Sequence, residues 1–196
     1  MEVPSCTALR AAQLSHTMEK RVTLKDRTFR LSMPEADILA AVDRIAVRMA
    51  ADLKDRQPLF LVVLNGAFMF AADLLKRVEI PAEVSFVKLS SYCGTESSGC
   101  VNEIIGLTQN VEGRTVVIVE DIVDSGLTMK RMTDMLRASG AGEIHIATLL
   151  SKPDALKYNV PLDYVAMEIP NDFIVGYGLD YDGLGRNLRD IYTVVD

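Results

Sequence analysis

The sequence predicts an α/β protein with a mostly parallel central sheet and helices on both faces. Two short segments, residues 59–64 and 116–119, are apolar at every position. Strands with one solvent-facing side alternate polar and apolar residues, so unbroken apolar runs indicate strands covered on both faces. Segments with helical periodicity alternate with such strands along the chain, which is the order that produces a parallel sheet.

Length and composition indicate one globular domain. The chain has 196 residues, of which 49% are hydrophobic and 6% aromatic, and this is enough to build one sizeable core. The net charge of -6 argues against a general nucleic-acid binder, because such proteins need a basic face to neutralise phosphates. No apolar run is long enough to span a bilayer, and the N-terminal segment lacks the pattern of a secretory signal.

The cysteine pattern favours a reducing, cytoplasmic location. The three cysteines are Cys6, Cys93 and Cys100. Their number is odd and no C-x-x-C spacing occurs, so the sequence predicts neither a disulfide framework nor a zinc site. A cytoplasmic protein is the simplest interpretation.

The first predicted element is a helix over residues 32–53. Residues 1–20, before it, show no clear period and are expected to form a loosely ordered extension. Ser32 is the expected N-cap, with Glu35 completing a capping box and Pro34 in the first turn. Apolar residues at helical spacing give this helix one buried stripe, formed by Ile38, Val42, Ile45, Met49 and Leu53.

Strands and helices alternate in the remainder of the chain. The segments expected after the strand at 59–64 are a helix at 67–78, a strand at 82–92, a polar mobile loop at 93–103 and a short strand at 103–107. A strand at 115–119 then leads into a helix that Gly140 closes as a C-terminal cap. Two further strands are expected, at 143–150 and 164–169.

Three carboxylates follow the apolar strand at 115–119 directly, and they are Glu120, Asp121 and Asp124. Ligands of parallel α/β sheets bind at the carboxyl ends of the strands, which is the position of these acids. The next turn offers hydroxyls, a flexible glycine and the N–H groups of a helix start to a phosphate, through Ser125, Gly126, Leu127 and Thr128. Acids beside an anion site fit a ligand that combines a phosphate with sugar hydroxyls, bound together with Mg²⁺.

A purely structural role explains single residues of this pattern equally well. Acids are common at helix starts because they complement the helix dipole, and Asp124 alone is explained as an N-cap. The three acids together with the hydroxyl-rich turn, behind a wholly apolar strand, favour a functional site.

The segment VVIVEDIVDSGLTM resembles the ribose-phosphate signature of the type I phosphoribosyltransferases. Further stretches, in the family's order, resemble its hypoxanthine(-guanine) branch: VVLNGAFMFAADLLKRV, SSYCGTESSG, LLSKPDAL and DFIVGYGLDYDGLGRNL. The resemblance covers the chain from about Leu59 to Val195. It implies the type I fold in a single domain over residues 1–196. The small hood lobe of that fold is expected from the N-terminal segment and about residues 160–196.

The activity that the resemblance implies is purine salvage with Mg²⁺. The family transfers the 5-phosphoribosyl group of phosphoribosyl pyrophosphate to N9 of hypoxanthine or guanine, giving IMP or GMP and pyrophosphate. Asp124 is then the expected general base, and the turn from Asp124 to Thr128 is expected to cradle the sugar phosphate. Glu120 and Asp121 are expected to face the ribose hydroxyls and the metal, and Asp180 to be a further metal ligand.

The resemblance also implies contacts with the pyrophosphate. Asn65 and Gly66 match the family's pyrophosphate loop, in which the peptide bond before Asn65 is often cis. The family often has Lys or Arg at this position, so Asn65 lacks that cation and the contact is expected from backbone N–H groups. Arg186 is expected to bind pyrophosphate as well. Ser91 and Tyr92 open a loop that is expected to close over the reacting centre.

For the purine, Lys152 matches the lysine that donates to O6 of the base. Phe173 matches the aromatic residue that stacks on the base, and Ile174 the residue whose backbone reads its edge. Asp180, in the same segment, is counted with the purine site as well. Without the family pattern, Lys152 would be interpreted as a solvated lysine and Phe173 as a core residue.

The expected partners are the two substrates and further copies of the chain, as a homodimer or homotetramer, with no nucleic acid and no membrane. The alternative is a regulatory protein that keeps the phosphoribosyl-pyrophosphate fold and binds nucleic acid. The net charge of -6 counts against it. A receiver-type signalling domain is a weaker interpretation, because it explains neither the turn at 125–128 nor the segment 173–181.

Overall fold

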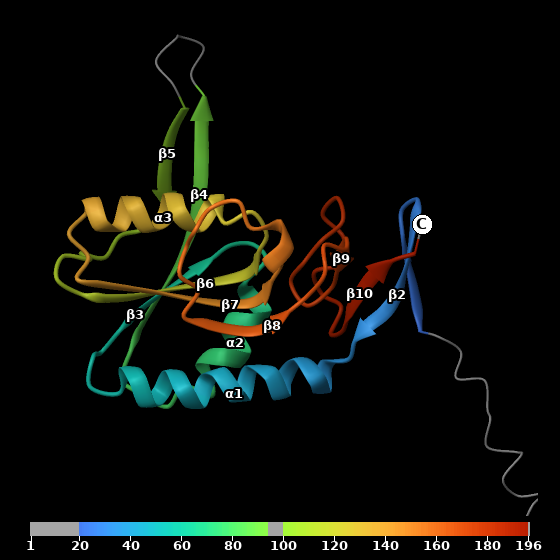
Figure 1. Ribbon diagram of the computed structural model, residues 1–196, viewed down its shortest axis with the longest axis horizontal. Coiled ribbons are helices and arrows are strands. Elements are labelled where there is room, and N and C mark those ends of the chain that lie inside the picture. Colours follow the sequence, from blue (N-terminus) through green and yellow to red (C-terminus); the bar gives the residue numbers. More distant parts are fainter. Residues whose placement is uncertain (1–19, 94–99, 196) are drawn as a thin grey trace, which may run out of the picture.

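The computed structural model describes residues 20–93 and 100–195, and within them it confirms the predicted α/β fold (Figure 1). Six strands of this part of the chain form a large sheet in the order β5-β4-β3-β6-β7-β8, and four form a small sheet in the order β1-β2-β10-β9. The large sheet comprises β3 (Leu59–Val63), β4 (Glu83–Cys93), β5 (Cys100–Ile105), β6 (Thr115–Val123), β7 (Glu143–Ser151) and β8 (Tyr164–Glu168).

The centre of the large sheet is parallel, as its apolar strands predict. Neighbouring strands from β4 to β8 pair in parallel, while β5 pairs antiparallel with β4 at the edge. Every residue of β3 is buried. Helices α1 (Glu35–Leu53) and α2 (Phe68–Leu75) cover one face, and α3 (Leu127–Ala138) covers the other (Figure 1). The carboxyl ends of β3, β6 and β7 therefore meet at one edge, beside the N-terminus of α3.

The small sheet is the predicted hood and joins distant parts of the chain. It comprises β1 (Arg21–Leu24), β2 (Arg27–Met33), β9 (Ile174–Val175) and β10 (Ile191–Val194), all paired antiparallel. Its own core packs around the buried side chains of Phe29, Val175 and Tyr192. Strand β8, within the range expected for the hood, pairs with β7 in the large sheet instead.

The predicted capping box of the first helix is wrong. Helix α1 has Pro34 as its N-cap, without a side-chain capping bond from that residue. The Ser32 hydroxyl donates to the carbonyl of Ile191 at 3.1 Å. The first N–H of the helix, at Glu35, instead donates to the carboxylate of Asp190 at 2.9 Å. A carboxylate from the other end of the chain thus takes the place of a local cap and ties the hood to α1.

The predicted polar loop at 93–103 is shorter than expected, because strands enter it from both sides. Cys93 ends β4 and pairs with Cys100, the first residue of β5. Strand β5 overlaps the short strand expected at 103–107, but it begins earlier, at Cys100, and ends at Ile105. The centre of the predicted loop lies outside the described residues, as does nearly all of the extension expected at 1–20.

The glycine cap predicted at the C-terminal end of the helix after β6 is confirmed. Gly140 closes α3 with a φ of 83°, and the N–H of Ala141 donates to the carbonyl of Leu136 at 3.0 Å, as in a glycine-closed helix end. None of the helices in the described part of the chain has the length and apolar character needed to cross a membrane.

Replacing Asp190 by Asn should destabilise the fold in a pH-dependent way. Burial alone would raise the pKa of Asp190, but bonds from Lys20, the Glu35 N–H and Tyr192 outweigh it and lower the pKa. An acid with a lowered folded-state pKa stabilises the fold above its unfolded pKa, about 3.9, and this stabilisation is lost as the pH falls through the folded value. Denaturant unfolding should show Asp190→Asn less stable by about 1–3 kcal/mol at pH 7.

The difference between Asp190→Asn and the parent should narrow below about pH 4. Asp55→Asn, at an exposed carboxylate just beyond the other end of α1, is the matched control and should leave stability unchanged. A pH-independent loss in Asp190→Asn would contradict the electrostatic explanation.

Candidate active site

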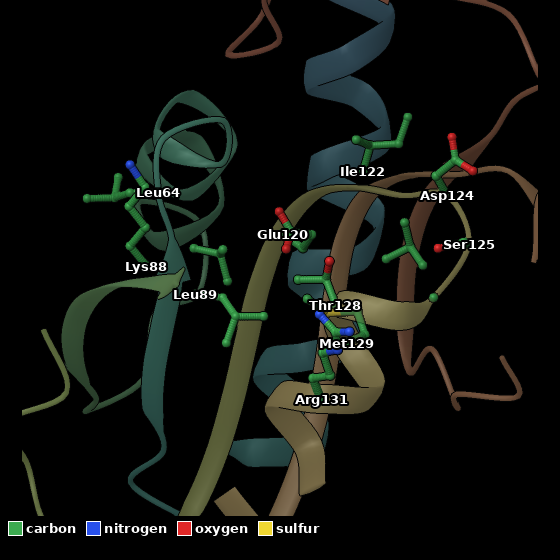
Figure 2. A pocket seen from close by; sticks show the side chains of 13 residues that line it. Leu64, Lys88, Leu89, Glu120, Ile122, Asp124, Ser125, Thr128, Met129 and Arg131 are labelled. Atoms are coloured by element: carbon green, nitrogen blue, oxygen red, sulfur yellow. The ribbon is translucent and has the colours of Figure 1, made fainter. Parts of the chain in front are cut away.

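Two adjoining cavities open at the carboxyl ends of β3 and β6. The first, of about 390 Å³, is lined by the turn before α3 and is termed the turn-side cavity (Figure 2). The second, of about 430 Å³, reaches the hood and is termed the hood-side cavity. Residues that line both are Val63, Leu64, Glu120, Ile122 and Asp124. Of the three acids predicted at the end of β6, Glu120 and Asp124 thus lie where the two cavities meet, and Asp121 lines the hood-side cavity alone.

The turn before α3 has the conformation that its glycine predicts. Gly126 is the N-cap of α3 with a φ of 80°, a left-handed conformation that favours glycine. The Ser125 hydroxyl accepts the N–H of Leu127 at 3.4 Å. Because Gly126 is the N-cap of α3, the explanation of Asp124 as an N-cap is wrong. Figure 2 shows Ser125 at the right, and Thr128 near the centre just below Glu120.

The Asp124 side chain is paired with the predicted purine-binding lysine. The Lys152 ammonium lies 3.3 Å from Asp124 Oδ2 and 3.4 Å from the side-chain oxygen of Asn171. Lys152 is 8% exposed, so it is not the solvated lysine of the alternative interpretation. A nearly buried ammonium requires such partners, because an unpaired charge is costly away from water.

The two adjacent acids at the end of β6 differ in their surroundings. Glu120 is 7% exposed. Burial, followed by the neighbouring Asp121, raises its pKa well above the ordinary value. The Asp121 carboxylate accepts a hydrogen bond from the backbone N–H of the next residue, Ile122, at 2.8 Å. A buried carboxylate beside a second one is an unfavourable arrangement that a bound cation relieves.

The loop after β3 has the predicted unusual peptide bond. The bond between Leu64 and Asn65 is cis, as the resemblance implies. A Cβ at Gly66 would lie 1.5 Å from Oδ2 of Asp121, and a Cβ at Gly178 would lie 2.0 Å from the carbonyl oxygen of Gly66. Glycine is therefore required at Gly178, where the hood meets the backbone of the loop after β3, while Gly66 leaves room for the Asp121 side chain at the end of β6.

Asp180 and Arg186 both line the hood-side cavity and are paired with each other. The guanidinium of Arg186 lies 2.5 Å from Asp180 Oδ1 and donates to the carbonyl of Gly178 at 2.7 Å. The other oxygen of Asp180 accepts the N–H of Gly183 at 2.7 Å. In the described part of the chain, no three or more His, Cys, Asp or Glu side chains form a group that could hold a metal ion.

The predicted purine-binding residues converge on the hood-side cavity. Phe173 lines this cavity together with Lys152 and Ile174. The ring is 42% exposed, which is inconsistent with the alternative interpretation of Phe173 as a core residue. Ile174 is buried as the first residue of β9, so its backbone is fixed by the hood sheet.

The remaining predicted residues, Ser91 and Tyr92, lie near the end of β4. Their backbones pair with Asn102 and Val101 of β5, so these residues belong to a two-stranded extension of the sheet edge.

Sequence reasoning missed several residues at the site. Lys88 and Arg131 line the turn-side cavity, and Asn171 contacts Lys152. Arg131 stands three residues after Thr128, a helical spacing that places both side chains on one face of α3. Lys88 and Asn171 carry no comparable signal, because their positions depend on how distant segments pack.

The comparisons with known proteins agree with this geometry. The family model described as "Phosphoribosyl transferase domain" matches residues 35–182. The hypoxanthine-guanine phosphoribosyltransferase of Streptococcus pyogenes is 41% identical over 79% of this chain and 86% of its own length. That of Streptococcus pneumoniae is 39% identical over 78% of this chain and 85% of its own.

Solved structures show the same relationship. A hypoxanthine phosphoribosyltransferase from Staphylococcus aureus superposes with a TM-score of 0.77 at 36% identity, covering 84% of this chain and 90% of that one. The chain therefore belongs to the phosphoribosyltransferase family. Within that family, its similarity to these enzymes places it in the hypoxanthine-guanine branch.

Proposed function

We propose that this site transfers the 5-phosphoribosyl group of phosphoribosyl pyrophosphate to N9 of hypoxanthine or guanine in purine salvage. The observation that carries the proposal is the placement of Asp124 and Lys152, 3.3 Å apart, between the turn at 125–128 and the exposed ring of Phe173. This is the order in which a nucleotide presents its phosphate, ribose and base. The enzyme names of the relatives favour this function over nucleic-acid regulation.

In the proposed reaction, the bond from ribose C1′ to the pyrophosphate oxygen breaks and a bond from C1′ to N9 forms. The proton of the purine imidazole ring passes to the Asp124 carboxylate, which acts as general base. The ammonium of Lys152 donates a hydrogen bond to O6, while Phe173 stacks on the ring and the backbone of Ile174 contacts its edge. An ammonium at O6 favours a carbonyl and disfavours adenine, whose amino group there is itself a donor.

Phosphate and pyrophosphate bind on opposite sides of the ribose. The sugar phosphate is held by the N–H groups and hydroxyls of residues 125–128 at the start of α3. Pyrophosphate is held by the backbone at Asn65 and Gly66 and by Arg186, which exchanges its carboxylate partner Asp180 for a phosphate oxygen. Ser91 and Tyr92 contribute when the end of the β4–β5 hairpin closes over the donor.

Mg²⁺ is the proposed cofactor, held by Glu120 and Asp121 with Asp180 as a further ligand. Two adjacent carboxylates fit this ion, which binds one or two carboxylates and takes its other ligands from water and substrate phosphates. Bound Mg²⁺ supplies positive charge to the pyrophosphate leaving group. The burial of Glu120 beside Asp121, which raises the pKa of Glu120, supports a site for a cation.

A steady-state assay tests the proposed function. Purified protein with phosphoribosyl pyrophosphate and Mg²⁺ should convert hypoxanthine and guanine, leave adenine unchanged, and lose turnover in excess chelator. Added Mg²⁺ should restore it. Absence of turnover with both oxopurines would overturn the proposal, and full activity in chelator would remove the metal from it.

Asp124→Asn should lower kcat by about 10²–10⁴-fold, because it keeps the shape of the side chain and removes the base. Donor binding, followed by calorimetry, should change little. Asp134→Asn, at an exposed position of α3, serves as the matched control and should retain parental kcat. A kcat within twofold of the parent for Asp124→Asn would refute the assignment of the base.

The chain is further proposed to form a homodimer or homotetramer in the cytoplasm. Val84 and Phe86 of β4 stand in register with Phe60 and Val62 of β3, so their side chains share one face of the sheet. Phe60 and Val62 are fully buried there, whereas Val84 and Phe86 are 42% and 53% exposed. Apolar side chains left uncovered beside a covered strand support contact with a second copy at β4.

Phe86→Ser should shift the protein toward the monomer, because it removes the largest exposed apolar side chain of this patch. Sedimentation velocity at several concentrations measures the change. Val47→Ser is the control, since Val47 is 72% exposed but lies on α1. A monomeric parent would refute self-association, and an unchanged Phe86→Ser oligomer would place the interface elsewhere.

A further inference from the structure

The ring of Phe173 has a cationic neighbour at the start of β2, next to the turn that joins β1 to β2. Phe173 lines the hood-side cavity, whereas Arg27, the first residue of β2, does not. The guanidinium carbon of Arg27 nevertheless lies 5.8 Å from the centroid of the Phe173 ring. Arg27 therefore lies beside the ring without lining the cavity itself.

Tyr181 connects the same turn to Phe173 by a second route. The Tyr181 ring meets the Phe173 ring edge-on, with centroids 5.8 Å apart and planes at 84°. The guanidinium of Arg27 also lies over Tyr181, 5.4 Å from its centroid. The Tyr181 hydroxyl donates to the Asp26 carboxylate at 2.8 Å. Asp26 of the turn thus contacts Tyr181, and Arg27, the next residue, contacts both rings.

The hood core limits how this ring pair moves. Phe29 is fully buried, and its ring centroid lies 6.2 Å from that of Phe173 and 6.1 Å from that of Tyr181. Phe173 thus has Phe29 and Tyr181 as ring neighbours and Arg27 as a cationic neighbour, while part of its surface remains open to the cavity. A ring fixed in this way loses little conformational freedom when a flat ligand stacks on it.

We propose that Arg27 is a positioning residue for purine binding, acting through Phe173 and Tyr181 without touching the substrate. The proposal rests on the proposed function, since Phe173 must be the stacking ring. A cation is attracted to the face of an aromatic ring, so Arg27 favours one orientation of Phe173 before the purine arrives. Its contribution falls on purine affinity, because neither Arg27 nor Tyr181 lines the turn-side cavity.

Arg27→Ala should raise the KM of hypoxanthine and of guanine about two- to fivefold, the size expected from an exposed cation–π contact. The kcat and the KM of phosphoribosyl pyrophosphate should remain at parental values. Arg27→Lys keeps the cation and should raise the purine KM less than Arg27→Ala does. Tyr181→Phe, which removes only the hydroxyl bonded to Asp26, should move purine KM in the same direction.

Lys25→Gln provides the matched control in the same turn. Lys25 forms an ion pair with Asp182, and both side chains are largely exposed, so the pair contributes little. This variant should keep parental purine KM. Thermal unfolding of every variant verifies that the fold is retained.

The outcomes separate this proposal from the proposed function. An inactive parent enzyme overturns both. An active parent whose Arg27→Ala and Tyr181→Phe variants keep parental purine KM overturns the role of Arg27 alone. An equal rise of purine KM in Lys25→Gln and Arg27→Ala would show that the turn only supports the fold, and would also overturn the proposal. A parallel rise in the KM of phosphoribosyl pyrophosphate in Arg27→Ala would have the same meaning.

Discussion

The close contact between the hood backbone at Gly178 and the loop after β3 at Gly66 is the constraint on which the site depends. A Cβ at Gly66 would lie 1.5 Å from the Asp121 carboxylate, and a Cβ at Gly178 would lie 2.0 Å from the Gly66 carbonyl oxygen. The hood can lie this close to the loop after β3 only because Gly178 lacks a side chain, and Gly66 leaves room for the Asp121 side chain at the end of β6. This contact brings hood residues that are far away in sequence to the carboxyl edge of the parallel sheet, where the acids of β6 lie.

The pairing of Lys152 with Asp124 links base recognition to proton transfer in the proposed reaction. A nearly buried ammonium needs an acceptor, and in the free protein Asp124 and Asn171 provide it. A purine carbonyl at O6 offers a replacement acceptor. Lys152 can then turn from Asp124 toward the base, which leaves the Asp124 carboxylate free to accept a proton. Asn171 keeps the lysine partly paired during this exchange, and its neutral amide competes with O6 less strongly than a carboxylate.

The parts of the fold that were predictable are those with a local sequence signal. Burial on both faces produces the unbroken apolar sequence of β3, and the turn at 125–128 needs a glycine with positive φ. The capping box at Ser32 failed because its local pattern is present while the carboxylate that serves the helix comes from Asp190, 155 residues away. The contacts of Arg27 and Asn171 likewise join segments distant in sequence, so neither periodicity nor spacing indicates them.

The acids at the end of β6 suit this edge of the sheet to a ligand that carries a cation. Without a bound cation, the same acids are electrostatically unfavourable. Glu120 is buried beside Asp121, and its pKa is raised by this burial and, after it, by the neighbouring carboxylate. A fold selected only for stability favours an apolar residue at this position, since replacing buried charge by apolar contacts is often neutral or stabilising. Carboxylates bind a cation and the hydroxyls of a sugar, which apolar side chains do not. The electrostatic cost of Glu120 and Asp121 is therefore explained by ligand binding at this edge.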